Sequence, residues 1–187
     1  FMMGIDPIRQ RDMLEEAVDV IVPLLRGETV TKKADWFELK EARLQLLPYS
    51  NPKIPIAVAS AVSPTGARIA GKHGIGLLSF AATSKSGFIS LPKNWEIAVQ
   101  QAEQHGQQVH KHDWSLVGPM HIAETREKAR ENMRFGLEKW VWYFNEVAAL
   151  AFNWEGNCDS LIDQINESSF GVIGTPEDAI NQIERLW

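Results

Sequence analysis

Residues 54–67 read Ile54-Pro55-Ile56-Ala57-Val58-Ala59-Ser60-Ala61-Val62-Ser63-Pro64-Thr65-Gly66-Ala67. The first six residues form a short apolar run without polar alternation, which is typical of a strand buried on both faces of a parallel sheet. Ser63 is a favourable N-cap and Pro64 a favourable first helical residue, so a helix is predicted to follow, to about His73. The stretch therefore predicts a buried strand, a turn of small residues and a helix.

The rest of the chain alternates between helical and strand-like patterns. Helices are predicted at 8–26, 93–105, 125–152 and from 175 onward; strands at 29–31, 35–39, 43–47, 75–80 and 114–123; loops at 81–92 and 153–170. Such alternation indicates βα units around a parallel sheet. Three units are counted, whereas a closed eight-stranded barrel needs about 250 residues. The pattern thus predicts an α/β fold, either part of a barrel or a doubly wound open sheet.

Composition and charge exclude several classes of protein. The 187 residues are 44% hydrophobic and 23% charged, as in globular proteins, and the net charge of −5 argues against nucleic acid or anionic membrane as a partner. No apolar run approaches the ~18 residues of a membrane helix. Cys158 is the only cysteine, which fits a reducing cytoplasm. We therefore expect a cytoplasmic protein whose partners are neither nucleic acid nor a membrane.

The turn after the first buried strand is the best candidate for a ligand site. Small side chains at 59–61 let a ligand approach the backbone, and the start of the next helix offers free N–H groups and a positive dipole end to a phosphate. Arg11, in the helix at 8–26, could bind the same phosphate through two parallel hydrogen bonds. Two alternatives stay open: many strand–helix turns bind nothing, and an isolated arginine is commonly a solvated surface charge.

Other polar residues are candidate metal ligands or catalytic groups, but the sequence supports these roles less. His110 and His112 are predicted to be solvent-exposed loop residues, since no converging ligands suggest a metal. His121 lies on a predicted strand and either lines a pocket or has a structural role. Glu15-Glu16 is interpreted as a solvated helix face. Cys158 has no basic neighbour in sequence, so no catalytic thiol is expected.

Several motifs together resemble those of a known family. They are Met2-Met3-Gly4-Ile5-Asp6-Pro7-Ile8-Arg9-Gln10-Arg11 with Met13-Leu14-Glu15-Glu16-Ala17, Ala57 to Gly66 with Ala70-Gly71 and Gly74-Ile75-Gly76, Gly118-Pro119-Met120-His121-Ile122-Ala123-Glu124-Thr125, and Gly174-Thr175-Pro176-Glu177. Their order and spacing resemble the luciferase-like flavin-dependent monooxygenase family, and its limonene-monooxygenase type most of all. The resemblance runs over nearly the whole chain.

The resemblance implies a (β/α)₈ TIM barrel that binds reduced FMN, usually supplied by a separate reductase, and uses O₂ to oxygenate a small apolar substrate. It implies that Arg11, Ala61, Val62 and Ser63 hold the FMN phosphate. F420, a deazaflavin, is the alternative cofactor for an oxidoreductase of the same fold, and a flavin-binding protein without catalysis is a third possibility. A homo-oligomer is also expected.

By family position the chain, residues 1–187, corresponds to a single segment of the barrel's C-terminal half, about strands five to seven. We therefore expect it to be truncated at both ends and to have little activity alone. The family's catalytic residues lie on the first strands, so no catalytic residue can be named. Phe1 stands where the limonene type commonly has Tyr, which removes one hydroxyl contact.

Overall fold

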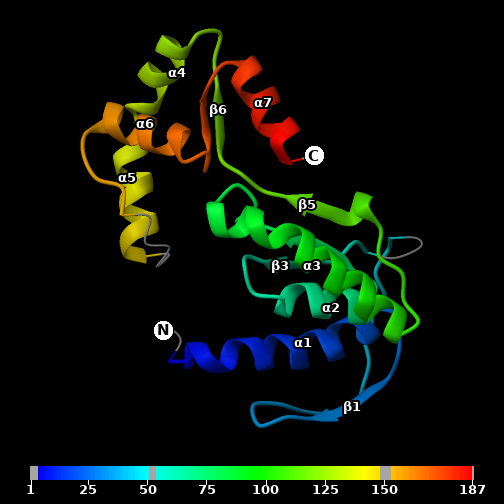
Figure 1. Cartoon of the computed structure of the whole chain (residues 1–187). Coiled ribbons are helices and arrows are strands. Elements are labelled where there is room, and N and C mark those ends of the chain that lie inside the picture. Colours follow the sequence, from blue (N-terminus) through cyan, green and yellow to red (C-terminus); the bar gives the residue numbers. More distant parts are fainter. Residues whose placement is uncertain (1–3, 51–53, 148–152, 187) are drawn as a thin grey trace. The chain divides into compact units, whose positions relative to one another are not determined.

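A computed structural model describes residues 4–50, 54–147 and 153–186 (Figure 1). The chain divides into two compact units. The first combines residues up to Leu78 with Pro92–Ser115, and the second combines Ser79–Leu91 with the residues from Leu116 onward. Strands and helices alternate within both units, which confirms the predicted α/β class.

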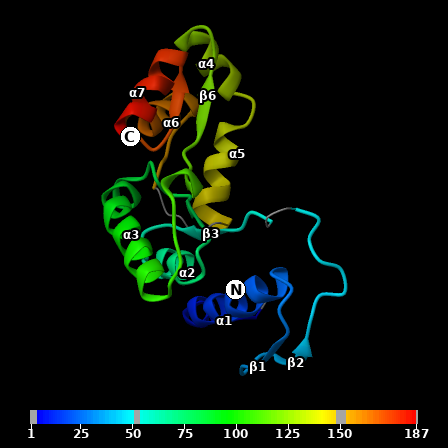
Figure 2. The same ribbon diagram turned by 90° about the vertical axis from the view of Figure 1, so that its right-hand side faces the viewer.

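The first unit begins with a long helix and a strand pair (Figure 2). A 3₁₀ turn, Pro7–Arg9, leads into α1 (Gln10–Leu25), so the helix predicted at 8–26 is confirmed. Strands β1 (Val30–Lys33) and β2 (Glu38–Ala42) pair antiparallel. The strand predicted at 43–47 is wrong, because these residues are irregular. Glu41 turns into the left-handed region at φ 48° and donates its N–H to the Thr31 hydroxyl, which disturbs the ladder just before this segment.

A three-stranded sheet of order β3-β4-β5 follows, with strands Ala57–Ser60, Gly76–Ser79 and Trp114–Leu116. Helix α2 (Thr65–His73) lies between the first two strands in sequence and ends, as predicted, at Gly74, whose φ is 61°. The prediction that the first strand is buried on both faces is wrong: Val58 and Ser60 are buried, whereas Ala57 and Ala59 are exposed. Only the face of Val58 packs into an apolar cluster, with Val18, Val22 and Ile69.

Residues 81–84 are a turn, as predicted, but helix α3 (Lys85–Gln104) contradicts the remainder of the loop predicted at 81–92 and the predicted helix start at 93. Ser84 provides the missing start signal, because its hydroxyl donates to the Ala81 carbonyl at 2.9 Å and accepts the N–H of Gly87 at 3.1 Å. Pro92 therefore lies inside the helix, where it removes the one hydrogen bond that its own N–H would have made.

In the second unit β6 (Met120–Ile122) pairs in parallel with β7 (Val172–Gly174), and His121 lies opposite Ile173. The single strand predicted at 114–123 is wrong, because its two ends belong to different sheets. Gly118 and Pro119 lie at the break. Proline has no N–H to donate, so the ladder does not continue through this position.

The helices of the second unit are shorter and more numerous than predicted. Thr125 caps α4 as expected, accepting the Lys128 N–H at 3.1 Å. The helix predicted to run to 152 is nevertheless wrong, because it is interrupted around Gly136, and residues 148–152 lie outside the described part of the chain. The segments are α4 (Arg126–Met133), α5 (Leu137–Trp142) and a π-helical turn (Tyr143–Val147).

The irregular region predicted at 153–170 is also wrong, because it contains α6 (Cys158–Glu167). Asn157 caps this helix by accepting the Ser160 N–H at 3.0 Å. The buried face of α6, Leu161, Ile162 and Ile165, forms the centre of the core of this unit. The last helix, α7 (Pro176–Leu186), follows β7 as predicted. Among the helices of the described ranges, none has the length and apolar character to cross a membrane.

Candidate cofactor site

The turn between β3 and α2 is ordered by its own hydroxyl groups. Ser60 Oγ donates to the Ser63 carbonyl at 3.1 Å, and Ser63 Oγ accepts the Thr65 N–H at 3.4 Å while lying 3.1 Å from the Thr65 hydroxyl. The helix is assigned from Thr65 with Pro64 as N-cap, one residue later than predicted. Such a one-residue difference is ordinary at helix ends, and the Ser63 hydroxyl still contacts the first turn.

Backbone donors remain available in this turn. Within the described ranges, the N–H groups of Val62 and Ser63 meet no protein acceptor, and the Val62 side chain is 45% exposed. A Cβ at Gly66 would lie only 2.8 Å from the Ala59 carbonyl oxygen and from Ser60 Cβ. Glycine therefore lets the helix start pack closely on the strand end. The result is a helix N-terminus with free donors, the arrangement that binds anions.

Arg11 of α1 lies in the first unit, as does the turn that begins α2. Glu15 of α1 pairs with Arg68 at 3.5 Å and with Lys72 at 3.2 Å, so α1 and α2 run side by side in the same direction (Figure 1). Arg11 precedes Glu15 by one helical turn, which sets it level with the first turn of α2. The interpretation of Glu15 as a solvated residue is wrong, because its carboxylate forms ion pairs with Arg68 and Lys72 of α2.

Partly buried charges hold α1 against α2. Burial raises the pKa of Asp19, but hydrogen bonds from Lys32, Lys72 and His73 outweigh burial and hold the pKa at about 2. Burial lowers the pKa of His73, and the Asp19 carboxylate offsets this only in part. His73 is therefore neutral at pH 7 and donates from Nε2 to Asp19 at 2.9 Å. This network holds the helix that carries Arg11 against the helix that begins at the turn.

The other candidates are not part of this site. His110 and His112 are exposed, as predicted, with ring centroids 5.2 Å apart. Across the described ranges no group of three or more His, Cys, Asp or Glu side chains is arranged to hold a metal ion. Burial is the main factor that raises the pKa of the Cys158 thiol, and the negative charges of Asp159 and Glu138 raise it further. The thiol is therefore protonated at neutral pH.

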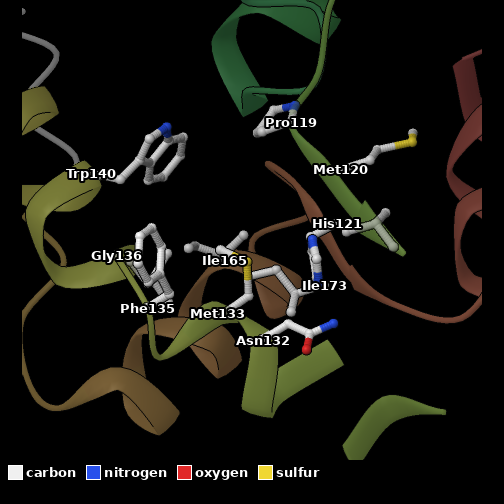
Figure 3. A pocket seen from close by; sticks show the side chains of 12 residues that line it. Pro119, Met120, His121, Asn132, Met133, Phe135, Gly136, Trp140, Ile165 and Ile173 are labelled. Atoms are coloured by element: carbon white, nitrogen blue, oxygen red, sulfur yellow. The ribbon is translucent and has the colours of Figure 1, made fainter. Parts of the chain in front are cut away.

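His121 lies on β6 opposite Ile173, in the structural role that the sequence favoured, and it also lines a pocket (Figure 3). The pocket has a volume of about 460 Å³ and lies within the second unit. Its lining residues come from β6, β7, α4, α5, α6 and their connections: Pro119, Met120, His121, Asn132, Met133, Phe135, Gly136, Leu137, Trp140, Ile165, Val172 and Ile173. Sequence reasoning did not find this pocket.

Comparison with known proteins gives the family. The model of the family described as luciferase-like monooxygenase matches residues 2–187. The chain belongs to the luciferase-like monooxygenase family. It is 50% identical over 185 residues to a limonene 1,2-monooxygenase of Rhodococcus erythropolis, across 99% of this chain and 47% of that protein. The chain thus spans about half the length of this luciferase-like relative.

Solved structures of similar fold support the same assignment. The monooxygenase RslO1 of Streptomyces bottropensis matches 96% of the chain and 51% of its own, with a TM-score of 0.71 at 18% identity. The oxygenating constituent of 3,6-diketocamphane monooxygenase from Pseudomonas putida, solved with FMN, matches 99% of the chain and 56% of its own (TM-score 0.62, 15% identity). An F420-dependent secondary alcohol dehydrogenase matches 96% and 53% (TM-score 0.60, 24% identity). These likenesses confirm the luciferase-like α/β fold; the assignment to strands five to seven stays a prediction.

Proposed function

We propose that the protein is a flavin-dependent monooxygenase that uses reduced FMN and O₂ to oxygenate a small apolar organic substrate. The observation that carries this proposal is the turn at 60–65, with two unpartnered amides at a helix start and an arginine level with it. The 50% identity to a limonene 1,2-monooxygenase supports the reaction class. Overall, reduced FMN supplies two electrons, one oxygen atom enters the substrate and the other leaves as water.

The turn has the properties that a flavin phosphate requires. The N–H groups of Val62 and Ser63 can donate to phosphate oxygens, and the Ser63 hydroxyl can add a third hydrogen bond. The small side chain of Ala61 leaves the backbone accessible. The positive end of the α2 dipole favours a dianion, and the Arg11 guanidinium can bind two phosphate oxygens at once. These residues would hold and orient FMN, while O₂ chemistry would come from the bound flavin.

Two partners are part of the proposal. A separate flavin reductase would supply the reduced cofactor, and O₂ would be the co-substrate. F420 is the competing cofactor, because a deazaflavin also places a phosphate group on the protein and an F420-dependent enzyme shares the fold. An F420 enzyme would transfer a hydride to or from its substrate and would consume no oxygen.

Titration of the full-length protein with FMN and with F420, followed by flavin fluorescence, tests the cofactor assignment. Ser63→Ala and Arg11→Ala should each weaken FMN binding by about 1–3 kcal/mol, the value of a hydrogen bond to a charged group. Arg9→Ala is the matched control, because Arg9 is two residues away and pairs with Asp35 at 3.7 Å on the surface. Unchanged FMN affinity in both site variants would remove the assignment.

Oxygen uptake tests the reaction itself. Because the chain spans about half the length of its limonene 1,2-monooxygenase relative, this test uses the full-length protein. With a flavin reductase, NADH and FMN, it should increase the yield of oxygenated product from apolar cyclic alkenes and ketones. The product must be measured directly, because free reduced flavin also consumes oxygen. Substrate-dependent reduction of F420 without oxygen uptake would instead favour the oxidoreductase.

A further inference from the structure

The hydroxyl group of Thr65 is buried beside the turn that begins α2. Thr65 is the first residue of the helix and is only 9% exposed. Within the described ranges, its Oγ1 has one hydrogen-bonding partner, Ser63 Oγ, at 3.1 Å. This hydrogen bond can run in either direction, because each hydroxyl oxygen carries a proton and also accepts. Its direction determines what the Ser63 side chain can offer to a ligand.

Burial decides the direction of the hydrogen bond between these two hydroxyl groups. If Ser63 donated its proton, the proton of Thr65 would be buried without an acceptor, which native structures avoid. If Thr65 donates, its own proton is satisfied, and Ser63 is exposed enough to direct its proton toward solvent or a ligand. Thr65 is therefore the donor and Ser63 the acceptor.

The Ser63 oxygen then accepts two hydrogen bonds from the same residue. The backbone N–H of Thr65 donates to it at 3.4 Å, in addition to the Thr65 hydroxyl. A serine hydroxyl has two lone pairs and one proton, so the proton is the group that remains available. The buried Ser60 hydroxyl donates to the Ser63 carbonyl at 3.1 Å and holds the backbone of the same residue. An ionised phosphate oxygen only accepts hydrogen bonds, so a free hydroxyl proton is suited to it.

We propose that Thr65 is a positioning residue of the cofactor site: its hydroxyl donates to Ser63 Oγ and so keeps the Ser63 proton directed toward the phosphate. The inference rests on the proposed function, because it concerns the same phosphate. Thr65 acts through Ser63 and does not touch the ligand. A hydroxyl proton has about three staggered positions around its Cβ–Oγ bond, so loss of this constraint should weaken phosphate binding by about threefold.

Thr65→Val tests the proposal, because valine keeps the branched shape and the backbone N–H and removes the hydroxyl. FMN and riboflavin are matched probes that differ by the phosphate group. In fluorescence titrations of the full-length protein, Thr65→Val should lower the preference for FMN over riboflavin by about threefold. Thr65→Ser, which keeps the hydroxyl, should retain the wild-type preference, and riboflavin affinity should be the same in all three proteins.

A double-mutant cycle separates this role from a general effect on the turn. In a Ser63→Ala background no Ser63 proton exists, so Thr65→Val should cause no further loss of FMN preference. An unchanged or increased preference in Thr65→Val alone, or an equal loss in Thr65→Ser, would overturn the proposal. Wild-type protein that binds FMN no more tightly than riboflavin would instead refute the phosphate site itself.

Neutron diffraction of the deuterated full-length wild-type protein keeps the test decisive if Thr65→Val fails to fold. The Thr65 hydroxyl deuterium should lie between Thr65 Oγ1 and Ser63 Oγ, and the Ser63 deuterium should point to solvent. A Ser63 deuterium directed at Thr65 Oγ1 would overturn the proposal. Because this measurement uses no FMN, its result is independent of whether the proposed function is correct.

Discussion

Asp19→Asn should destabilise the α1–α2 pair by an amount that the structure allows to be worked out. The Asp19 carboxylate pairs with Lys32 at 2.9 Å and with Lys72 at 2.7 Å, and its pKa is about 2 against an ordinary 3.8. At about 1.4 kcal/mol per pH unit, this difference corresponds to about 2 kcal/mol of folding free energy. The side chain is 23% exposed, so solvent screens this interaction only in part.

The sign of the pH dependence follows from the lowered pKa. A carboxyl whose pKa is lower in the folded state stabilises the fold at pH values above 3.8, and this contribution disappears as pH falls from 3.8 through 2. Urea unfolding at pH 7 should therefore show a loss of about 2 kcal/mol for Asp19→Asn, and the difference from wild type should shrink below pH 4.

Asp35→Asn is the matched control, because Asp35 is 94% exposed and its partner Arg9 lies at 3.7 Å. Its effect should stay below about 0.5 kcal/mol at every pH. Equal losses for the two variants at pH 7, or a loss for Asp19→Asn that is unchanged at pH 3, would refute the account of the network. A carboxyl ¹³C titration of Asp19 with a midpoint near 4 would do the same.

Three further predictions concern the second unit. Ile162→Ala should cost about 2–5 kcal/mol in urea unfolding because Ile162 is fully buried, whereas Ile180→Ala, at a side chain 54% exposed, should cost less than about 0.5 kcal/mol. Thr125→Ala should cost about 1 kcal/mol in the same assay and Thr125→Ser much less, because serine keeps the capping oxygen of α4. Iodoacetamide should alkylate Cys158 more slowly at pH 7 than it alkylates free cysteine, because its raised pKa leaves little thiolate; an equal rate would contradict the burial of the thiol.

The sequence is sufficient to predict the end of a helix where a single residue type determines the backbone conformation or the cap. Gly74 ends α2 because a left-handed φ of 61° is accessible to glycine, and Thr125 begins α4 because its hydroxyl accepts an N–H of the first turn. The turn at 60–65 was predictable for the same reason. Each of these features depends on a few neighbouring residues.

Predictions failed where one local signal was given too much weight over another. Pro92 predicts the end of a loop, although Ser84 caps α3, which begins at Lys85, eight residues before the predicted start at 93. Asn157 is a comparable N-cap before α6, and Leu161, Ile162 and Ile165 follow it at helical spacing. Both caps were present in the sequence. The polar residues between 153 and 170 concealed the second one, because the solvent face of an amphipathic helix is itself polar.

The pocket at His121 belongs to a third category, because no local signal could have revealed it. Its walls exist only after β6 pairs with β7, about fifty residues away in sequence, and after α4 and α5 fold back over the pair. A histidine on a strand indicates nothing until the atoms around its nitrogens are known. The proposed cofactor turn and this pocket therefore differ in kind: sequence predicts the first from adjacent residues, whereas the second arises from contacts between distant segments. Substitutions at 61 and 62 should act on anion binding alone, whereas substitutions at Ile122 or Gly174 that loosen the β6–β7 pair should abolish the pocket without changing a residue that lines it.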